Sequence, residues 1–366
     1  MIDRRLVTNF DWTLLGIVVV ICLLGILNIY SASAPYKLMA TPYYIKQLNW
    51  MVFGLIITLL ICSVDYHIFE DFAYWVYGFI VLLLLAVMLV GKKSLGATRW
   101  LDLGLFTMQP SELMKIGIIL TFARFFNNYH AVGGLTVKDM LFPIGLLGLP
   151  ALMIMKQPDL GTATLVVLIA FSMAFFVGFR WSTLVTFLLV TVPLAWLTWT
   201  VYMKPYQKSR VLDFLDPERS RLGSGYHIIQ SKIAVGSGGL WGKGFVQGTQ
   251  SQLSFLPEQH TDFAFSVYAE EWGFAGTLLL IVLYISLILW GLNIARRCND
   301  RLGALLAVGV TAMLFWHTVI NIGMVIGLFP VVGVPLPFFS YGGTSMITSM
   351  VGVGILQNIS MRKFMF

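Results

Sequence analysis

Long apolar runs, each about the length needed to cross a bilayer, constrain this chain more than any other feature. A membrane-spanning helix needs about 20 mostly apolar residues, because the hydrocarbon core is about 30 Å thick. The sequence contains eight clear runs and two weaker ones (110–127 and 140–156): 12–32, 44–63, 72–91, 110–127, 140–156, 162–178, 182–202, 274–294, 302–328 and 339–359. It therefore predicts an all-α integral membrane protein with about ten transmembrane helices.

The composition agrees with this fold class. Of 366 residues, 58% are hydrophobic and 11% are charged, with a mean hydropathy of +0.83, and a soluble core of this size needs less apolar surface. The five histidines and three cysteines show neither metal-ligand spacing nor a disulfide framework, so no metal ligands are assigned. We expect residues 1–366 to form a single polytopic membrane domain without a cleaved signal peptide.

Lysines and arginines in the short loops predict the orientation, because cytoplasmic loops carry an excess of them. Ten spans put both ends on one side, where ten of these cations fall, against six in the short loops opposite. The excess predicts a multi-pass protein of a cytoplasmic membrane with both termini in the cytoplasm. The cations in the outward loops either bind lipid headgroups or serve an anionic ligand.

One long extracytoplasmic loop, about residues 203–262, is expected between the seventh and eighth helices. It is basic and contains GSGYHIIQSKIAVGSGGLWGKG, in which seven of 22 residues are glycine. Loops of this length are usually functional or disordered, and this one has too many aliphatic and aromatic residues for free disorder. Its glycines let the backbone approach a ligand closely, but nucleotide-binding patterns are absent. We expect no nucleic acid among its partners.

Charged residues stand at the outer starts of three predicted helices. In QPSELMK, Glu112 and Lys115 share a helix face, and charges inside a span usually face a partner or a wet cavity. In QPDLGT, Asp159 is an N-cap candidate. In FLPEQHTDF, His260 and Asp262 precede an apolar run. For each site a structural role is the alternative: an ion pair for Glu112 and Lys115, and a helix cap for either aspartate.

Two further features belong to the same outer side. A continuous helix over 263–294 would be about 48 Å long, which would place Asp262 at or above the outer membrane surface. The segment FPVVGVPLPFFSYGG contains three prolines, which preclude a regular helix. Irregular backbone at membrane depth is tolerated where protein buries it or a cavity wets it, so this segment is either a plain connection or a cavity wall.

Five segments together resemble the SEDS family (shape, elongation, division and sporulation) of bacterial cell-wall polymerases. They are QPSELMK, QPDLGT, GSGYHIIQSKIAVGSGGLWGKG, TQSQLSFLPEQHTDF and PVVGVPLPFFSYGG. The resemblance runs from about residue 12 to the C-terminal end. The stretch QGTQSQLSFLPEQHTDF is more similar to the elongation branch, RodA, than to the division branch, FtsW.

The resemblance implies a peptidoglycan glycosyltransferase that polymerises lipid II into β-1,4 glycan strands at the outer face of the bacterial cytoplasmic (inner) membrane. It implies that Asp262 is the essential catalytic aspartate, that Glu112 and Lys115 are a functionally important pair, and that Asp159 lies in a motif that lines the central cavity. It also implies a class B penicillin-binding protein transpeptidase as partner, within the elongation machinery. The alternatives are a flippase that transports lipid II and a noncatalytic scaffold.

The chemistry of that reaction suggests roles for these residues. A sugar hydroxyl is a poor nucleophile until a base takes its proton, and Asp262 is the candidate base. The diphosphate leaving group needs positive charge, from Lys115, Arg210 or a divalent cation (Mg²⁺ or Mn²⁺) at an unknown site. We also assign His260 to the substrate-binding set. Direct displacement would invert the anomeric centre.

Overall fold

The computed structural model describes residues 8–34, 41–94, 97–102, 104, 107–129, 133–203, 205–220, 224–253, 255–256 and 258–363. Among the loop cations that enter the orientation argument and the long basic loop, five lie outside the described residues: Arg4, Arg5, Lys37, Lys204 and Arg221.

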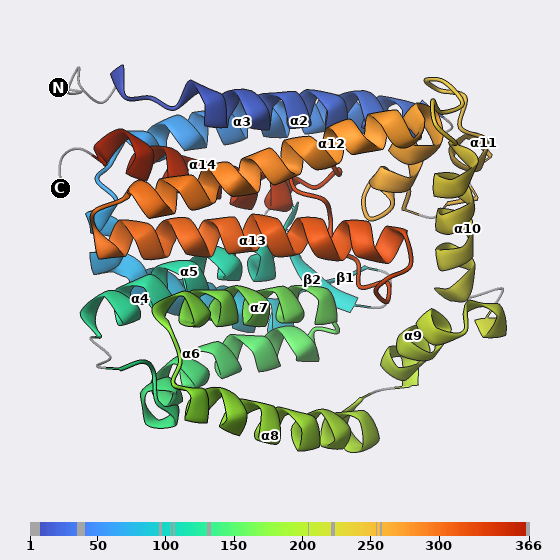
Figure 1. Ribbon diagram of the computed structural model, residues 1–366. Coiled ribbons are helices and arrows are strands. Elements are labelled where there is room, and N and C mark those ends of the chain that lie inside the picture. Colours follow the sequence, from blue (N-terminus) through green and yellow to red (C-terminus); the bar gives the residue numbers. More distant parts are fainter. Residues whose placement is uncertain are drawn as a thin grey trace.

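Long helices occupy all ten predicted runs, which confirms the all-α membrane fold. In the described part of the chain they are α2 (Trp12–Ala32), α3 (Tyr43–Ser63), α4 (His67–Val90), α5 (Pro110–Asn128), α6 (Val137–Lys156), α7 (Leu160–Val177), α8 (Trp181–Leu197), α12 (Ala264–Arg297), α13 (Arg301–Val325) and α14 (Gly343–Arg362). They run side by side along one direction in Figure 1, whereas α10 lies across their ends at the right.

Eight of these helices, counted over the described residues, are long and apolar enough to cross a membrane. The other two, α5 and α14, are the more polar ones, and most of their residues are buried. Polar residues such as Lys115 and Asn358 are tolerated there because protein surrounds these helices instead of lipid. The contrast is α8, whose large apolar side chains are exposed along its length.

Two connections between long helices, from α4 to α5 and from α8 to α12, contain regular elements that the sequence did not predict. The described residues between α4 and α5 include a three-stranded antiparallel sheet of β1 (Lys92–Ser94), β2 (Ala97–Asp102) and β3 (Thr107–Met108). The long connection from α8 to α12 is largely helical, since its aliphatic residues need burial. It contains η2 (Thr198–Tyr202), α9 (Pro205–Leu215), η3 (Pro217–Ser220), α10 (Ser224–Ser237) and α11 (Thr249–Gln252).

A sharp break at Gly273 divides α12, where φ is 62° and ψ is −160°. Only glycine adopts this backbone readily. The break leaves backbone groups without helical partners, and the segment 238–244 supplies them. The bonds run from Lys243 N to Glu270 O (3.0 Å), Gly244 N to Glu271 O (3.0 Å), Phe274 N to Gly239 O (2.9 Å) and Ala275 N to Leu240 O (3.0 Å).

Two expectations are corrected by this break. The helix over 263–294 is not continuous, so its summed length no longer indicates the height of Asp262, whose place at or above the membrane surface stays a prediction. Residues 264–271, which follow Asp262, are buried in protein. The glycines of segment 238–244 allow close approach of backbone to α12, where the sequence suggested a ligand. A Cβ atom on Gly273 would stand 2.3 Å from the Gly242 nitrogen.

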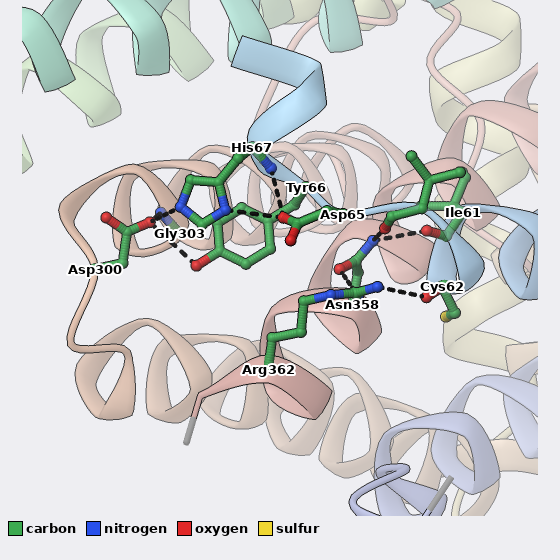
Figure 2. Close-up of polar contacts among 10 residues, drawn as sticks. Ile61, Cys62, Asp65, Tyr66, His67, Asp300, Gly303, Asn358 and Arg362 are labelled. Carbon is green, nitrogen blue, oxygen red and sulfur yellow. Dashed lines mark hydrogen bonds and ion pairs between the residues drawn. The ribbon is translucent and has the colours of Figure 1, made fainter. Parts of the chain in front are cut away.

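A polar network ties the helices together at the end of α12 and α14 away from Asp262 (Figure 2). His67 contacts Asp65 through Nδ1 (2.8 Å) and Asp300 through Nε2 (3.4 Å). Asp300 also caps α13 by accepting from Gly303 N (2.9 Å). Arg362 at the end of α14 donates to Cys62 O (3.2 Å). The network fastens the corner between α3 and α4 to the start of α13 and the end of α14.

Candidate functional site

A cavity of about 670 Å³ lies at the opposite end of the bundle from this network. Residues from distant parts of the sequence line it: Arg99, Trp100, Gln109, Glu112, Thr162, Arg210, His227, Glu258, Thr261, Asp262, Phe263, Val331, Val332, Gly333, Pro335, Tyr341, Gly342, Thr344 and Ser345. The proline-rich connection between α13 and α14 thus forms part of the wall, as one of its two sequence interpretations predicted.

Four long helices begin at this cavity. Gln109 and Glu112 mark the start of α5, Thr162 that of α7, Phe263 that of α12 and Thr344 that of α14. A helix start carries a partial positive charge and unsatisfied N–H groups, so it favours anions. The fold therefore directs four positive helix ends toward one space.

Asp262 borders this cavity and is half-buried. The residue at the N-cap of α12 is Phe263, and no side chain there accepts a capping hydrogen bond. The cap interpretation of Asp262 therefore finds no support. Burial and the nearby Glu258 carboxylate raise the pKa of Asp262 to about 6, against the lowering effect of Arg210 and Arg99.

Two arginines bring positive charge to the cavity. Arg210 on α9 donates from Nη1 to Val331 O (3.2 Å). Arg99 on β2 donates from Nε to Gln157 O (3.3 Å) and from Nη2 to Pro158 O. In these hydrogen bonds both guanidinium groups donate to backbone carbonyl oxygens and not to a carboxylate.

Asp159 lies behind the wall, 2% exposed, and it does cap a helix. Its side chain accepts from Thr162 N (3.4 Å) and Thr162 Oγ1 (2.9 Å) at the start of α7. It also accepts from Gln109 Nε2 (2.8 Å), and its Oδ1 lies 3.9 Å from Arg99 Nη1. Asp159 therefore contacts three lining residues, but it is not itself among the described residues that line the cavity.

Glu112 lines the cavity, whereas Lys115 is buried behind it with 1% exposure. Lys115 Nζ lies 2.7 Å from Glu112 Oε2 and 2.6 Å from Nε2 of His317 on α13. An ammonium group this deeply buried requires such acceptors. The predicted pair is thus formed, with a third member, His317, from the neighbouring helix α13.

His260 lies beside the cavity, packed against an aromatic side chain. Its ring stacks on Tyr43 with centroids 4.2 Å apart, and its carbonyl accepts from Tyr341 N (2.9 Å). Burial lowers the pKa of His260. The described lining does not include His260, so its assignment to substrate binding stays a prediction.

Comparison with known proteins places this geometry in a family. The family described as "Cell cycle protein" (FtsW/RodA/SpoVE) matches residues 11–364. The chain belongs to this family. Its match covers all ten long helices and every residue of the cavity.

Several members of the FtsW/RodA/SpoVE family are similar over almost their whole length. Peptidoglycan glycosyltransferase MrdB of Escherichia coli strain K12 is 42% identical over 98% of this chain and 95% of its own. Peptidoglycan glycosyltransferase RodA of Treponema pallidum is 33% identical over 98% and 99%.

Solved structures have the same fold as this chain. A chain of a peptidoglycan synthase complex, described for structural coordination of polymerization and crosslinking, has a TM-score of 0.83 at 31% identity, covering 98% of this chain and 99% of that one. Crystalline RodA of Thermus thermophilus has a TM-score of 0.71 at 28% identity, covering 97% and 98%.

Several residues in or beside the cavity of this FtsW/RodA/SpoVE chain received no functional role from the sequence motifs. Arg99 lies in β2, a strand without clear alternation of hydrophobic residues, although its charge in a loop predicted to face outward was a signal. His227 and Glu258 lie within two of the quoted segments, but neither was assigned a role, and Trp100 belongs to no quoted segment. His317 is a lone histidine in an apolar run, and its contact with Lys115 spans 202 positions, so only the packing of helices reveals it.

Proposed function

We propose that this chain is a peptidoglycan glycosyltransferase that polymerises lipid II into β-1,4 glycan strands during cell elongation. The names of the MrdB and RodA relatives support the reaction. The observation that carries the proposal is the position of Asp262. It is a carboxylate with a raised pKa in a cavity that also holds Arg99 and Arg210.

The proposed reaction is one direct displacement. Asp262 takes the proton of an acceptor sugar hydroxyl, whose oxygen attacks the anomeric carbon of the donor sugar. The bond from that carbon to the diphosphate oxygen breaks, and the lipid diphosphate leaves with the electron pair. Attack from the opposite face inverts the α-linked donor into a β-linked product. A diphosphate leaving group needs no proton, so a single carboxylate is sufficient.

Positive charge for the leaving diphosphate comes, in this proposal, from Arg99, Arg210 and the four helix starts. Arginine suits this role because its planar guanidinium group binds phosphate oxygens in pairs. Lys115 was an expected donor of charge, but it contacts Glu112 and His317 in this structure. We propose that it acts on the substrate through Glu112, which faces the cavity.

A divalent cation remains a prediction from the sequence. The described residues contain no group of three or more His, Cys, Asp or Glu side chains placed to hold a metal ion. The reaction proposed here is therefore written without a metal, through Arg99, Arg210 and the four helix starts.

We further propose that the protein works in the bacterial cytoplasmic (inner) membrane with both termini in the cytoplasm and the cavity facing outward. The distribution of loop lysines and arginines supports this orientation, and lipids of the outer leaflet would surround the cavity end. We also propose a class B penicillin-binding protein as partner within the elongation machinery. The similar chain from a complex that couples polymerization to crosslinking supports this.

The test is polymerisation of labelled lipid II by the purified protein, with and without the transpeptidase, read as a ladder on a gel. We expect Asp262→Asn to remove the ladder while the protein stays folded. The matched control is Asp139→Asn. Asp139 is the third residue of α6, where its side chain accepts from Thr136 N in a capping box, and asparagine keeps an acceptor oxygen at that position. A normal ladder from Asp262→Asn would contradict the assignment of the base. A lipid II flippase, the alternative function, would instead move labelled lipid II between leaflets without forming polymer.

A further inference from the structure

Two polar residues stand one turn apart on α13, a helix whose central part is largely buried. His317 is 2% exposed and Asn321 is 0% exposed. Positions four residues apart lie on the same face of a helix. This face is turned toward the cavity wall, since both side chains form hydrogen bonds with the segment 334–335. Neither residue borders the cavity itself among the described residues.

The contacts of His317 define its tautomer. The Lys115 ammonium group has donors only, so Nε2 of His317 accepts from it at 2.6 Å. The ring is then neutral with its proton on Nδ1, which donates to Pro335 O at 3.2 Å. Pro335 and Glu112 both line the cavity. His317 therefore joins two parts of the wall through one ring and the Lys115 ammonium group.

Asn321 makes the corresponding connection for Asp262. Its Nδ2 donates to Val334 O at 2.7 Å and to Asp262 O at 3.0 Å. Its Oδ1 is buried without a hydrogen-bond partner among the described residues. A buried polar atom left unsatisfied costs stability. An apolar residue would avoid that cost but would release the Asp262 backbone.

We propose that His317 and Asn321 are positioning residues of the glycosyltransferase reaction, a role that rests on the proposed function. His317 holds Lys115 and thereby Glu112, and Asn321 holds the backbone of Asp262. Both act against the same short segment of the wall. The pair thus fixes the spacing between the Glu112 side of the cavity and the Asp262 side. A small displacement of a catalytic group lowers the rate sharply, by about a hundredfold for 1 Å.

Two variants of His317 separate its two bonds. In His317→Gln, Oε1 stands as many bonds from Cα as Nε2 does in histidine, so it still accepts from Lys115. In His317→Asn, Nδ2 replaces Nδ1, so the bond to Pro335 O is kept and the bond to Lys115 is lost. We expect kcat for lipid II polymerisation to fall about tenfold or more in His317→Asn and to recover most of that loss in His317→Gln.

For Asn321 we expect Asn321→Leu, which keeps the size and removes both donors, to lower kcat about tenfold or more with KM within about twofold of wild type. The matched control is Thr318→Val on the same helix. Thr318 Oγ1 bonds only Leu314 O within α13 in the described contacts, so kcat should remain normal.

Thermal melting in detergent, measured beside the rates, distinguishes positioning from folding. Equal kcat per folded protein in His317→Asn, His317→Gln and wild type, with only the melting temperature lowered, would overturn the proposal for His317. Normal kcat in Asn321→Leu would overturn it for Asn321. Wild-type protein serves as the separate check on function: if it forms no polymer, the proposed function fails and the positioning role falls with it.

Discussion

Asp262 and Asp159 show how two aspartates in similar sequence contexts acquire different roles. Both precede an apolar run. Asp159 accepts hydrogen bonds from Gln109 and from Thr162 in the first turn of α7, which donates through both its backbone N and its Oγ1. Asp262 forms no capping bond and faces the cavity instead. A carboxylate already satisfied by several donors is a weak base, so the less satisfied Asp262 is the better candidate.

The raised pKa of Asp262, about 6, predicts the pH dependence of both rate and stability. Because the base form is needed, the polymerisation rate should rise with pH up to about 6 and then level off. The pKa in the folded state exceeds the ordinary value of 3.8. Folding therefore favours the protonated form, and the stability gained at low pH is lost as pH rises from about 4 to about 6.

Melting curves of wild type and Asp262→Asn, measured from about pH 4 to pH 7, test the direction of this stability change. The two melting temperatures should be nearly equal near pH 4, and the Asn variant should melt higher at pH 7. A variant that melts lower than wild type at pH 7 would show that the Asp262 charge stabilises the fold.

The pair of Glu112 and Lys115 predicts a partial rescue of stability without rescue of activity. Lys115→Met leaves the Glu112 carboxylate buried without its cation, which costs about 3–5 kcal/mol. The double variant Glu112→Gln, Lys115→Met carries neither charge and should regain much of that stability. Polymerisation should stay low in both. If the double variant regained normal specific activity, the pair would serve folding alone.

At the scale of the elements, the break in α12 gives Asp262 its place. The Gly238–Gly244 backbone holds both sides of the break, so the short helical piece that begins after Asp262 has a direction of its own. Gly273→Ala should destabilise the protein by at least about 2 kcal/mol, because the left-handed backbone strains alanine and its Cβ meets Gly242.

Gly78→Ala is the matched control for that prediction. Gly78 lies within α4, where an added Cβ meets nothing within 4 Å. It should leave stability unchanged or raise it by about 0.5–1 kcal/mol. The melting temperatures of the two variants test this difference. Equal melting temperatures for Gly273→Ala and Gly78→Ala would show that Gly273 tolerates a side chain and that the break does not depend on glycine.

The elements also show where sequence reasoning reaches its limit. Apolar runs located the ten long helices because lipid selects for them directly. The break at Gly273 could not be predicted, because a single glycine beside an apolar run is ordinary and its bonding partners lie some 30 positions away. Likewise Glu112 and Lys115 were recognisable from spacing on one helix, whereas His317 and Arg99 reach the site only through tertiary packing.

For the whole molecule, the decisive property is that its two ends differ. One end holds the cavity, and the other holds the Asp65, His67 and Asp300 network (Figure 2). The start of α2 and the end of α14 lie together at the left of Figure 1. The sequence predicts which end faces the cytoplasm only from charge in the loops, and that orientation stays a prediction.

Oriented vesicles test it. If the cavity faces outward, lipid II confined to the inner leaflet should not be polymerised, and lipid II in the outer leaflet should be. Adding an independent flippase should make the inner pool available. A membrane-impermeant probe of inner-leaflet lipid II supplies the control. If this protein alone exposed that pool, transport would be supported and the one-sided site would be contradicted.

The volume of the cavity has a consequence for inhibition. At about 670 Å³ it falls within the range of pockets that enclose drug-sized molecules, although the glycan product grows far beyond that size. With the proposed orientation, a compound would reach it from the periplasm. An antibiotic directed at this pocket would never need to enter the cytoplasm, so it would escape the permeability barrier of the inner membrane.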